Sequence, residues 1–169
     1  MICKKCGLPE IILSTPQYHY LESGLENIYL SPVIIIVCEK CSTKRPQING
    51  STLLNITIAE SIVLKPFALV GAELKFLRNN LGYSTNQWAE LLHLDIENME
   101  ALENEEEPIT PQFDLLTRLF YVRLLEENSG QNVTTSLMEK LAQIDFDNPD
   151  NSITLINLDT SPKYHYLHP

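Results

Sequence analysis

Four cysteines arranged as two Cys-x-x-Cys pairs are the residues whose type and spacing most clearly predict chemistry in this chain. Each pair can place two thiolates on one side of a metal ion through a tight turn, and the 31 residues between the pairs are enough for a small antiparallel sheet. Four thiolates in a tetrahedron are the usual ligands of structural zinc, and they leave no open position for catalysis. We therefore expect one structural Zn²⁺ per chain, held by Cys3, Cys6, Cys38 and Cys41.

Two disulfides or a single redox Cys-x-x-Cys are the alternatives to a zinc site. Disulfides would suit a secreted protein, but Lys4 and Lys5 interrupt the start of the chain and no apolar signal-peptide segment follows. A redox motif needs one pair at a strand-to-helix turn, not two pairs. Bases near the cysteines would offset the charge of about −2 that four thiolates leave on Zn²⁺; they are Lys4, Lys5, Lys40, Lys44 and Arg45.

Composition and charge exclude several broad classes of protein. The longest apolar run, residues 33–38, is far shorter than the ~18 residues of a membrane helix, so we expect a cytoplasmic protein without membrane contact. The net charge of −10 argues against indiscriminate binding to nucleic acid. The sequence has no glycine-rich phosphate loop, nucleophile elbow or open metal-site spacing, so we do not expect an enzyme.

The sequence predicts an α+β chain, in which short strands position the cysteines and helices follow them. Residues 1–45 predict short strands at 11–13, 18–21, 27–30 and 33–38, and residues 46–70 a connector with a possible helix at 53–64. Residues 71–127 predict helices at 72–81, 84–92 and 95–104 and one beginning at Pro111, with Trp88 in their core. The extension, residues 128–169, predicts a short helix from Ser136 and a strand at 152–158.

Several segments of this pattern carry a resemblance to known proteins. The helical residues resemble the XRE-type, lambda-repressor-like helix-turn-helix; they are 73–78, Ser84, 88–92, Glu103-Asn104, Pro108-Ile109 and 115–119. Residues 18–25 and 27–30 are similar to the YgiT-type zinc finger. The chain therefore resembles the MqsA/YgiT-type family over residues 1 to about 125. The resemblance implies a zinc ribbon followed by a helix-turn-helix in a dimeric DNA-binding transcriptional regulator, sometimes the antitoxin of a toxin–antitoxin pair.

The recognition helix departs from the pattern of that family. In that family the segment before Glu-Asn-Gly usually reads Val-Ser-Arg-Trp, whereas here residues 99–102 read Met-Glu-Ala-Leu. Glu105 stands in the position of the family's glycine. Residues 95–107 hold seven acids and no base, although phosphate contacts require bases. The candidate DNA-binding residues are Lys75, Arg78, Thr85, Asn86, Gln87, Asn98, Glu100, Ala101 and Arg118. Of these, we expect Arg78 and Arg118 to form ion pairs with acids rather than to contact phosphates.

Two functions are consistent with this sequence. The first is a DNA-binding transcriptional regulator, as the resemblance implies. The alternative is a protein-interaction module, antitoxin or adaptor, whose acidic helical surface meets a basic protein or toxin. In both cases we expect a homodimer, because the fourth helix carries a surplus of apolar residues, including Phe120, Tyr121, Leu124 and Leu125.

A similar eight-residue segment occurs near both ends of the chain. Residues 14–21 read Ser-Thr-Pro-Gln-Tyr-His-Tyr-Leu and residues 160–167 read Thr-Ser-Pro-Lys-Tyr-His-Tyr-Leu. When the two segments are aligned, Tyr164-His165-Tyr166 matches Tyr18-His19-Tyr20. Chance is one explanation. The other is that the tail forms a strand that occupies a similar sheet edge.

Overall fold

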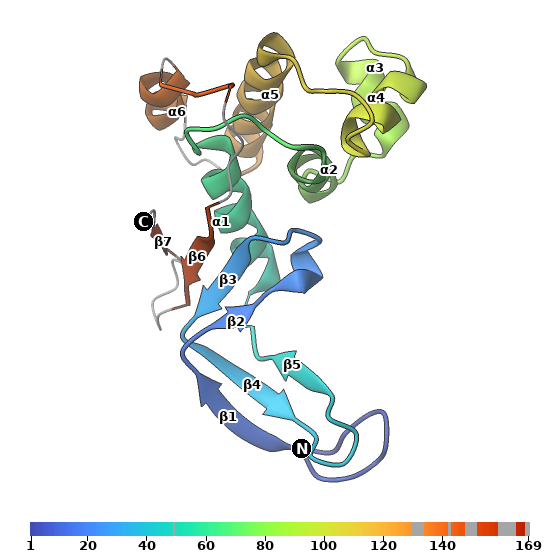
Figure 1. The fold of residues 1–169 in the computed structure, drawn as a ribbon, viewed down its shortest axis with the longest axis vertical. Helices are drawn as coiled ribbons and strands as arrows, with labels where there is room; N and C mark the ends of the chain where they lie inside the picture. The colour runs from blue at the N-terminus through green and yellow to red at the C-terminus, as the bar shows by residue number, and fades with distance from the viewer. Residues whose placement is uncertain (49, 130–133, 142, 148–151, 159–164, 168–169) are drawn as a thin grey trace.

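A computed structural model of the chain describes residues 1–48, 50–129, 134–141, 143–147, 152–158 and 165–167. The molecule is elongated, with the N-terminal sheets at one end and a group of helices at the other (Figure 1). The α+β order predicted from the sequence, a cysteine-bearing β region followed by a helical region, is confirmed.

The sheet farthest from the helices has three antiparallel strands in the order β1-β4-β5 (Figure 1). These are β1 (Ile11–Thr15), β4 (Val33–Val37) and β5 (Lys44–Pro46). Ile11 pairs with Val37 and Thr15 with Val33, so this sheet ends beside the two cysteine turns. The runs of β-branched residues in β1 and β4 favour strands because such side chains suit a pleated surface. We call this three-stranded sheet the distal sheet.

The second sheet joins the two ends of the chain. It has the order β2-β3-β6-β7, with strands β2 (Tyr18–His19), β3 (Ile28–Ser31), β6 (Thr154–Asn157) and β7 (His165–Leu167). Strands β3 and β6 are parallel, and the other two pairs are antiparallel. The two similar segments therefore contribute the opposite edges of one sheet, although residues 160–164 lie outside the described residues.

Six α-helices are described, besides a short 3-10 helix at Leu21–Ser23, and local sequence signals fix several of their ends. They are α1 (Ser51–Val63), α2 (Gly71–Asn80), α3 (Thr85–Leu91), α4 (Ile96–Glu103), α5 (Pro111–Ser129) and α6 (Thr134–Leu141), which begins before the predicted Ser136. Gly82 follows α2 with φ +80°, a conformation that glycine adopts without steric cost. Ser84 and Gln87 form the predicted capping box of α3, with reciprocal side-chain-to-backbone bonds of 3.2 and 2.9 Å.

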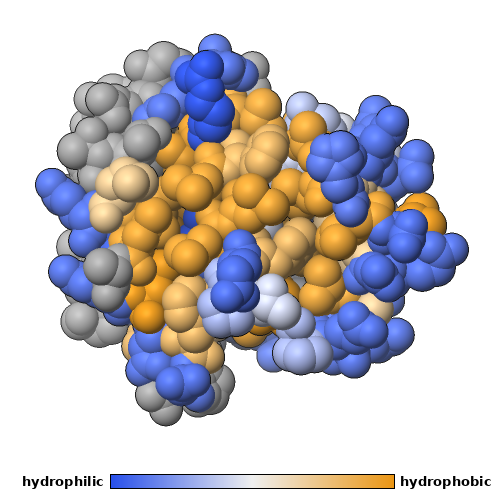
Figure 2. Space-filling model, turned by 90° about the horizontal axis from the view of Figure 1, so that it is seen from above, coloured by the Kyte–Doolittle hydropathy of each residue, from blue (hydrophilic) through white to orange (hydrophobic). Residues whose placement is uncertain are grey.

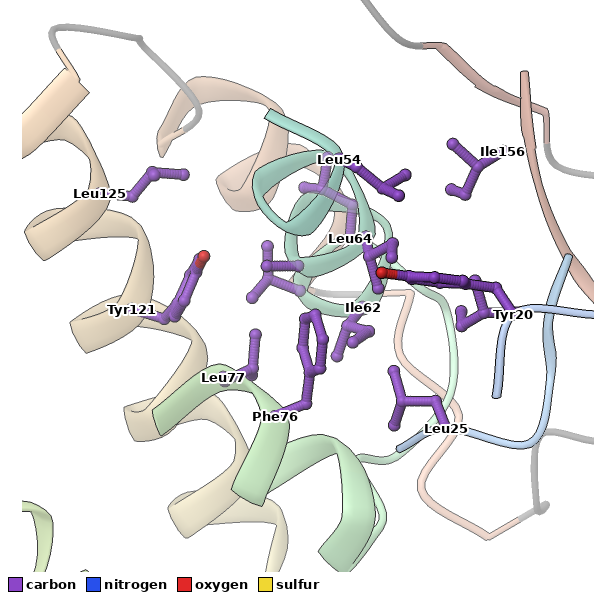
Figure 3. Packing of buried hydrophobic residues seen from close by; sticks show 14 of the residues in the cluster. Tyr20, Leu25, Leu54, Ile62, Leu64, Phe76, Leu77, Tyr121, Leu125 and Ile156 are labelled. Carbon is purple, nitrogen blue, oxygen red and sulfur yellow. The ribbon is translucent and has the colours of Figure 1, made fainter. Parts of the chain in front are cut away.

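Helix α1 lies at the centre of a core that the second sheet and the helices share (Figure 3). Figure 3 shows Leu54, Ile62 and Leu64 among side chains that come from the sheet on one side and from α2 and α5 on the other. Tyr121 and Ile156, 35 positions apart in the chain, both belong to this cluster and are both fully buried. The second sheet and the helices are therefore held by one body of apolar contacts.

A smaller core lies inside the helical group. Its centre is Trp88, which is fully buried as predicted and packs with buried residues of α2, α3 and α4; these are Leu74, Ala89, Leu92, Met99 and Leu102. Helix α2 contributes to both cores, because Leu77 faces the larger cluster while Leu74 faces Trp88. Helices α3 and α4 thus pack against α2, which links their core to the larger one.

Candidate metal centre and helical surface

Two short turns present the four cysteines at the free end of the distal sheet. In the first turn the backbone N–H of Cys3 donates to Leu8, the N–H of Gly7 donates to Cys3 (2.8 Å each), and Gly7 has φ +72°. In the second turn the N–H of Cys38 donates to the carbonyl oxygen of Thr43 over 3.0 Å. Each turn therefore brings its two cysteines to one side, as a Cys-x-x-Cys metal ligand pair requires.

The four sulfur atoms form one compact group. Cys3 Sγ lies 3.6 Å from Cys41 Sγ, Cys6 Sγ lies 3.4 Å from Cys38 Sγ, and all four lie within 4.8 Å of one another. A disulfide needs sulfurs about 2.05 Å apart, and none is present among these free cysteines. Tetrahedral zinc with Zn–S bonds of about 2.3 Å places its sulfurs about 3.8 Å apart, so the spacing fits this ion. The cluster is a single candidate metal site of four thiols.

The electrostatics of the cluster favour a bound cation. Hydrogen bonds from the hydroxyl and the backbone N–H of Thr43 lower the pKa of Cys41 to about 6. The backbone N–H of Leu8 acts to lower the pKa of Cys6, but the neighbouring thiol of Cys38 and burial raise it to about 12. Four thiols this close cannot all ionise without a compensating positive charge. A divalent cation supplies that charge, which couples metal binding to release of the protons.

Bases and apolar side chains surround the centre. Lys4, Lys5, Lys40 and Lys44 are exposed, and Arg45 forms an ion pair with Glu10 over 2.9 Å. Strand β1 is an edge strand of the distal sheet with both faces open, since Ile11, Ile12 and Leu13 are all exposed. An exposed apolar edge strand is a place where another strand can pair. The sequence predicted this strand but not its exposure on both faces.

The predicted DNA-binding residues fall into two groups. Those on the surface of the helical region are fully or partly exposed; they are Lys75, Thr85, Asn86, Gln87, Asn98, Glu100 and Ala101. Arg78 and Arg118 are buried, and both are paired with acids, as we expected for them. Neither arginine has a guanidinium group free to meet a phosphate, so both are removed from the DNA-binding set.

Arg78 of α2 holds α4 in place. Its guanidinium group donates two bonds to Glu103 at the end of α4, over 2.5 and 2.8 Å, and further bonds to Asn79 and to the carbonyl oxygen of Tyr83. Burial strengthens such a bidentate pair electrostatically, because little water competes for it. The position of α4 is therefore fixed by an ion pair that leaves its outer face free.

The outer face of α4 and the loop after it are acidic. Glu97 and Glu100 are exposed on the helix, and Glu105, Glu106 and Glu107 are exposed in the loop. Glu105, which stands where the resembling family has glycine, has φ +61°, a left-handed conformation that costs a residue with a Cβ. Gly71 lies against the end of α4, and a Cβ added there would lie 2.5 Å from the carbonyl oxygen of Leu102.

The sequence missed a second set of buried charges, on α2, on α5 and in the segment between α1 and α2. Arg118 pairs with Asp114 and also donates to the carbonyl oxygens of Val63, Lys65 and Phe67. Lys65 in turn pairs with Glu73 over 2.8 Å, with both side chains less than a tenth exposed. Only the i,i+4 spacing of Asp114 and Arg118 could have signalled any of these contacts in the sequence.

Comparisons with known proteins do not assign the chain to a family. No protein-family model matches the chain, and comparisons with curated proteins and with solved structures find no match. Within the described residues, no helix combines the length and the apolar character needed to cross a membrane. What stands is a cysteine cluster suited to one metal ion in a β region, followed by a helical region.

Proposed function

We propose that this protein is a zinc-stabilised interaction protein whose acidic helical surface binds a basic surface of another protein. The observation that carries the proposal is the charge on the outer face of α4, where Glu97 and Glu100 are exposed. The two arginines that could offset this charge, Arg78 on α2 and Arg118 on α5, are buried in ion pairs. Carboxylates on that face repel phosphates, and DNA binding needs bases to position a recognition helix. The same carboxylates attract lysine and arginine side chains of a protein partner.

The zinc ion in this proposal is structural. Four thiolates fill its coordination sphere, so it holds the two cysteine turns together and leaves no position for a substrate. A distal sheet with an apolar edge strand exposed on both faces has little core of its own, and a bound metal compensates for that. A basic toxin-like protein is the partner that the resemblance to the MqsA/YgiT-type family implies.

Binding to a protein partner is tested by charge reversal on α4. The variant Glu97→Lys/Glu100→Lys is compared with wild type and with Glu139→Lys, a control that reverses an exposed acid on α6. We expect affinity purification from the native cells to retain one basic protein with wild type and control, and to lose it with the α4 variant. A titration of that purified protein should weaken as salt is raised. Equal retention by all three proteins would reject the proposal.

A DNA-binding transcriptional regulator is the second candidate function. Asn86 and Gln87 in the first turn of α3 and Asn98 on α4 are exposed polar residues of the kind that contact DNA, which favours it. We expect wild type to bind its own upstream DNA weakly and with a steep loss in salt. Glu100→Ser/Ala101→Arg should strengthen binding by roughly 1–3 kcal/mol through a new arginine contact. Tight, sequence-specific binding by wild type that the double substitution weakens would establish α4 as a DNA reader.

A further inference from the structure

A cavity of about 510 Å³ lies where the second sheet meets the helices. Its wall is formed by the first residues of β3 and β6, the end of α1 with the segment that follows, the first turn of α2 and residues of and after α6. The volume is in the range of cavities that hold small organic ligands. It lies away from the cysteine cluster and from the acidic face of α4, so neither site accounts for it.

The cavity combines an apolar wall with buried charge. Ile28, Ile62 and Leu64 are buried and form part of the apolar lining, with Phe67 half-buried beside them. The polar part of the lining includes the buried pair of Lys65 and Glu73. Apolar walls with a few fixed polar groups are the usual composition of a ligand site.

Glu73 is held in place by its own bonds. Its carboxylate accepts from Lys65 over 2.8 Å and from the backbone N–H of Val70 over 2.9 Å, which also caps α2. Burial raises the pKa of Glu73, while Lys65 acts in the opposite direction. Glu73 therefore offsets the charge of Lys65, and a ligand in the cavity meets that pair as a fixed dipole.

Lys140 supplies a charge that the lining does not offset. It is half-buried on α6, and no contact of its ammonium group with an acid is found among the described residues. With Glu73 engaged by Lys65, the three charged groups of the lining carry a net charge of one positive unit. We propose that this cavity binds a small organic anion, with an apolar or aromatic body against Ile62 and Phe67 and one carboxylate or sulfonate group facing Lys140.

Such a ligand would connect the two parts of the molecule. It would touch β3 and β6 on one side, and Glu73 in the first turn of α2 on the other. Because a ligand that binds only the folded state stabilises it, occupancy should raise the temperature of unfolding. The inference does not depend on which partner the helical surface binds, since none of the cavity residues lies on the acidic face of α4.

The test uses two dyes that share a ring system and differ in charge. The full-length zinc-bound protein is titrated with 8-anilinonaphthalene-1-sulfonate, an aromatic anion, and with neutral N-phenyl-1-naphthylamine, following fluorescence. We expect one saturable site per chain for the anion and at least tenfold weaker binding of the neutral dye. Octanoate, an aliphatic anion, should compete with the bound dye and raise the unfolding temperature.

Four variants locate the binding site. Lys140→Glu should weaken binding of the anion about tenfold or more, since attraction becomes repulsion, while Lys44→Glu on β5 makes the same charge change outside the cavity and should leave it unaltered. Thr154→Trp fills the cavity from β6, where tryptophan suits a strand, and should abolish saturable binding. Equal affinity in wild type and Lys140→Glu, or loss of binding in Leu119→Lys on α5 instead, would overturn the proposal.

Discussion

Replacing Arg118 by methionine should strongly destabilise the protein, because Arg118 is half of a fully buried ion pair on α5. The guanidinium group of Arg118 is fully buried and donates to Asp114, and to backbone oxygens of Val63, Lys65 and Phe67 over 2.9, 2.9 and 2.6 Å. These oxygens belong to the end of α1 and to the segment that leads to α2. Methionine keeps the length of the side chain but leaves the carboxylate and these carbonyl groups without their donor.

The expected loss follows from the burial of the pair. Removing one partner of a fully buried ion pair costs about 3–5 kcal/mol, because the other charge stays in a low-dielectric site. In a protein of this size, 1 kcal/mol shifts the unfolding temperature by about 2–4 °C, so Arg118→Met should lower it by roughly 6–20 °C. A second ion pair on the same helix serves as the control. Arg123 and Glu127 have the same i,i+4 spacing but are 68% and 49% exposed, so Arg123→Met should cost only about 0.3–0.5 kcal/mol.

Urea denaturation followed by far-ultraviolet circular dichroism, with zinc present throughout, measures all of these variants. A third variant, Arg118→Met/Asp114→Asn, removes the stranded charge, while the amide oxygen that replaces the carboxylate can still accept from the N–H of Leu69. It should recover part of the stability lost in Arg118→Met. If Arg118→Met costs no more than Arg123→Met, or if the double variant is less stable than the single one, the buried pair does not act as described.

Three further changes test other parts of the structure. Glu105→Gly should raise the free energy of unfolding by about 1 kcal/mol by relieving a left-handed φ, whereas the control Glu106→Gly should not; equal effects in urea denaturation would contradict this. Gly71→Ala should lower it by about 1–3 kcal/mol, since the added methyl group meets carbonyl oxygens of α4; an unchanged midpoint would argue against that contact. We also expect a homodimer through the outer face of α5, which Leu119→Lys should dissociate in light scattering; a monomeric wild type would refute it.

The expected dimer surface shows how far the sequence could predict side-chain exposure. The apolar surplus of α5 is real, but Tyr121 and Leu125 are buried in the large core rather than left for a partner. Leu116 and Leu119 are the exposed apolar residues of this helix, at 38% and 39%. Figure 2, which looks onto the helical end, shows a broad apolar area bordered by hydrophilic side chains. Composition indicated the surplus, but only packing could decide which residues remain outside.

Local signals in the sequence explain why most elements were predicted. Ser84 and Gln87 form the capping box that their spacing indicates, and Gly82 ends α2 in the conformation that glycine allows. The two Cys-x-x-Cys spacings likewise predicted the single cluster of four sulfurs. Each of these features depends on residues a few positions apart or on a ligand spacing that recurs in structural zinc sites.

Long-range contacts explain what the sequence could not reveal. Strands β3 and β6 pair in parallel although more than a hundred residues separate them, and nothing in either segment specifies the other. The role of Arg118 was equally hidden, because most of its partners are backbone oxygens, which every residue carries. Pairing partners and backbone acceptors are determined by the folded arrangement as a whole rather than by neighbouring residues.

Native mass spectrometry of the protein, purified under reducing conditions without added metal, tests the zinc centre most directly. The spacing of Cys3, Cys6, Cys38 and Cys41 predicts one zinc ion per chain, and Cys38→Ser should reduce this content well below one equivalent. Removing zinc with a chelator should loosen the distal sheet, while the core around α1 keeps the second sheet and the helices folded. Less than half an equivalent of zinc in the wild type, or two intact disulfides among these cysteines, would contradict the assignment.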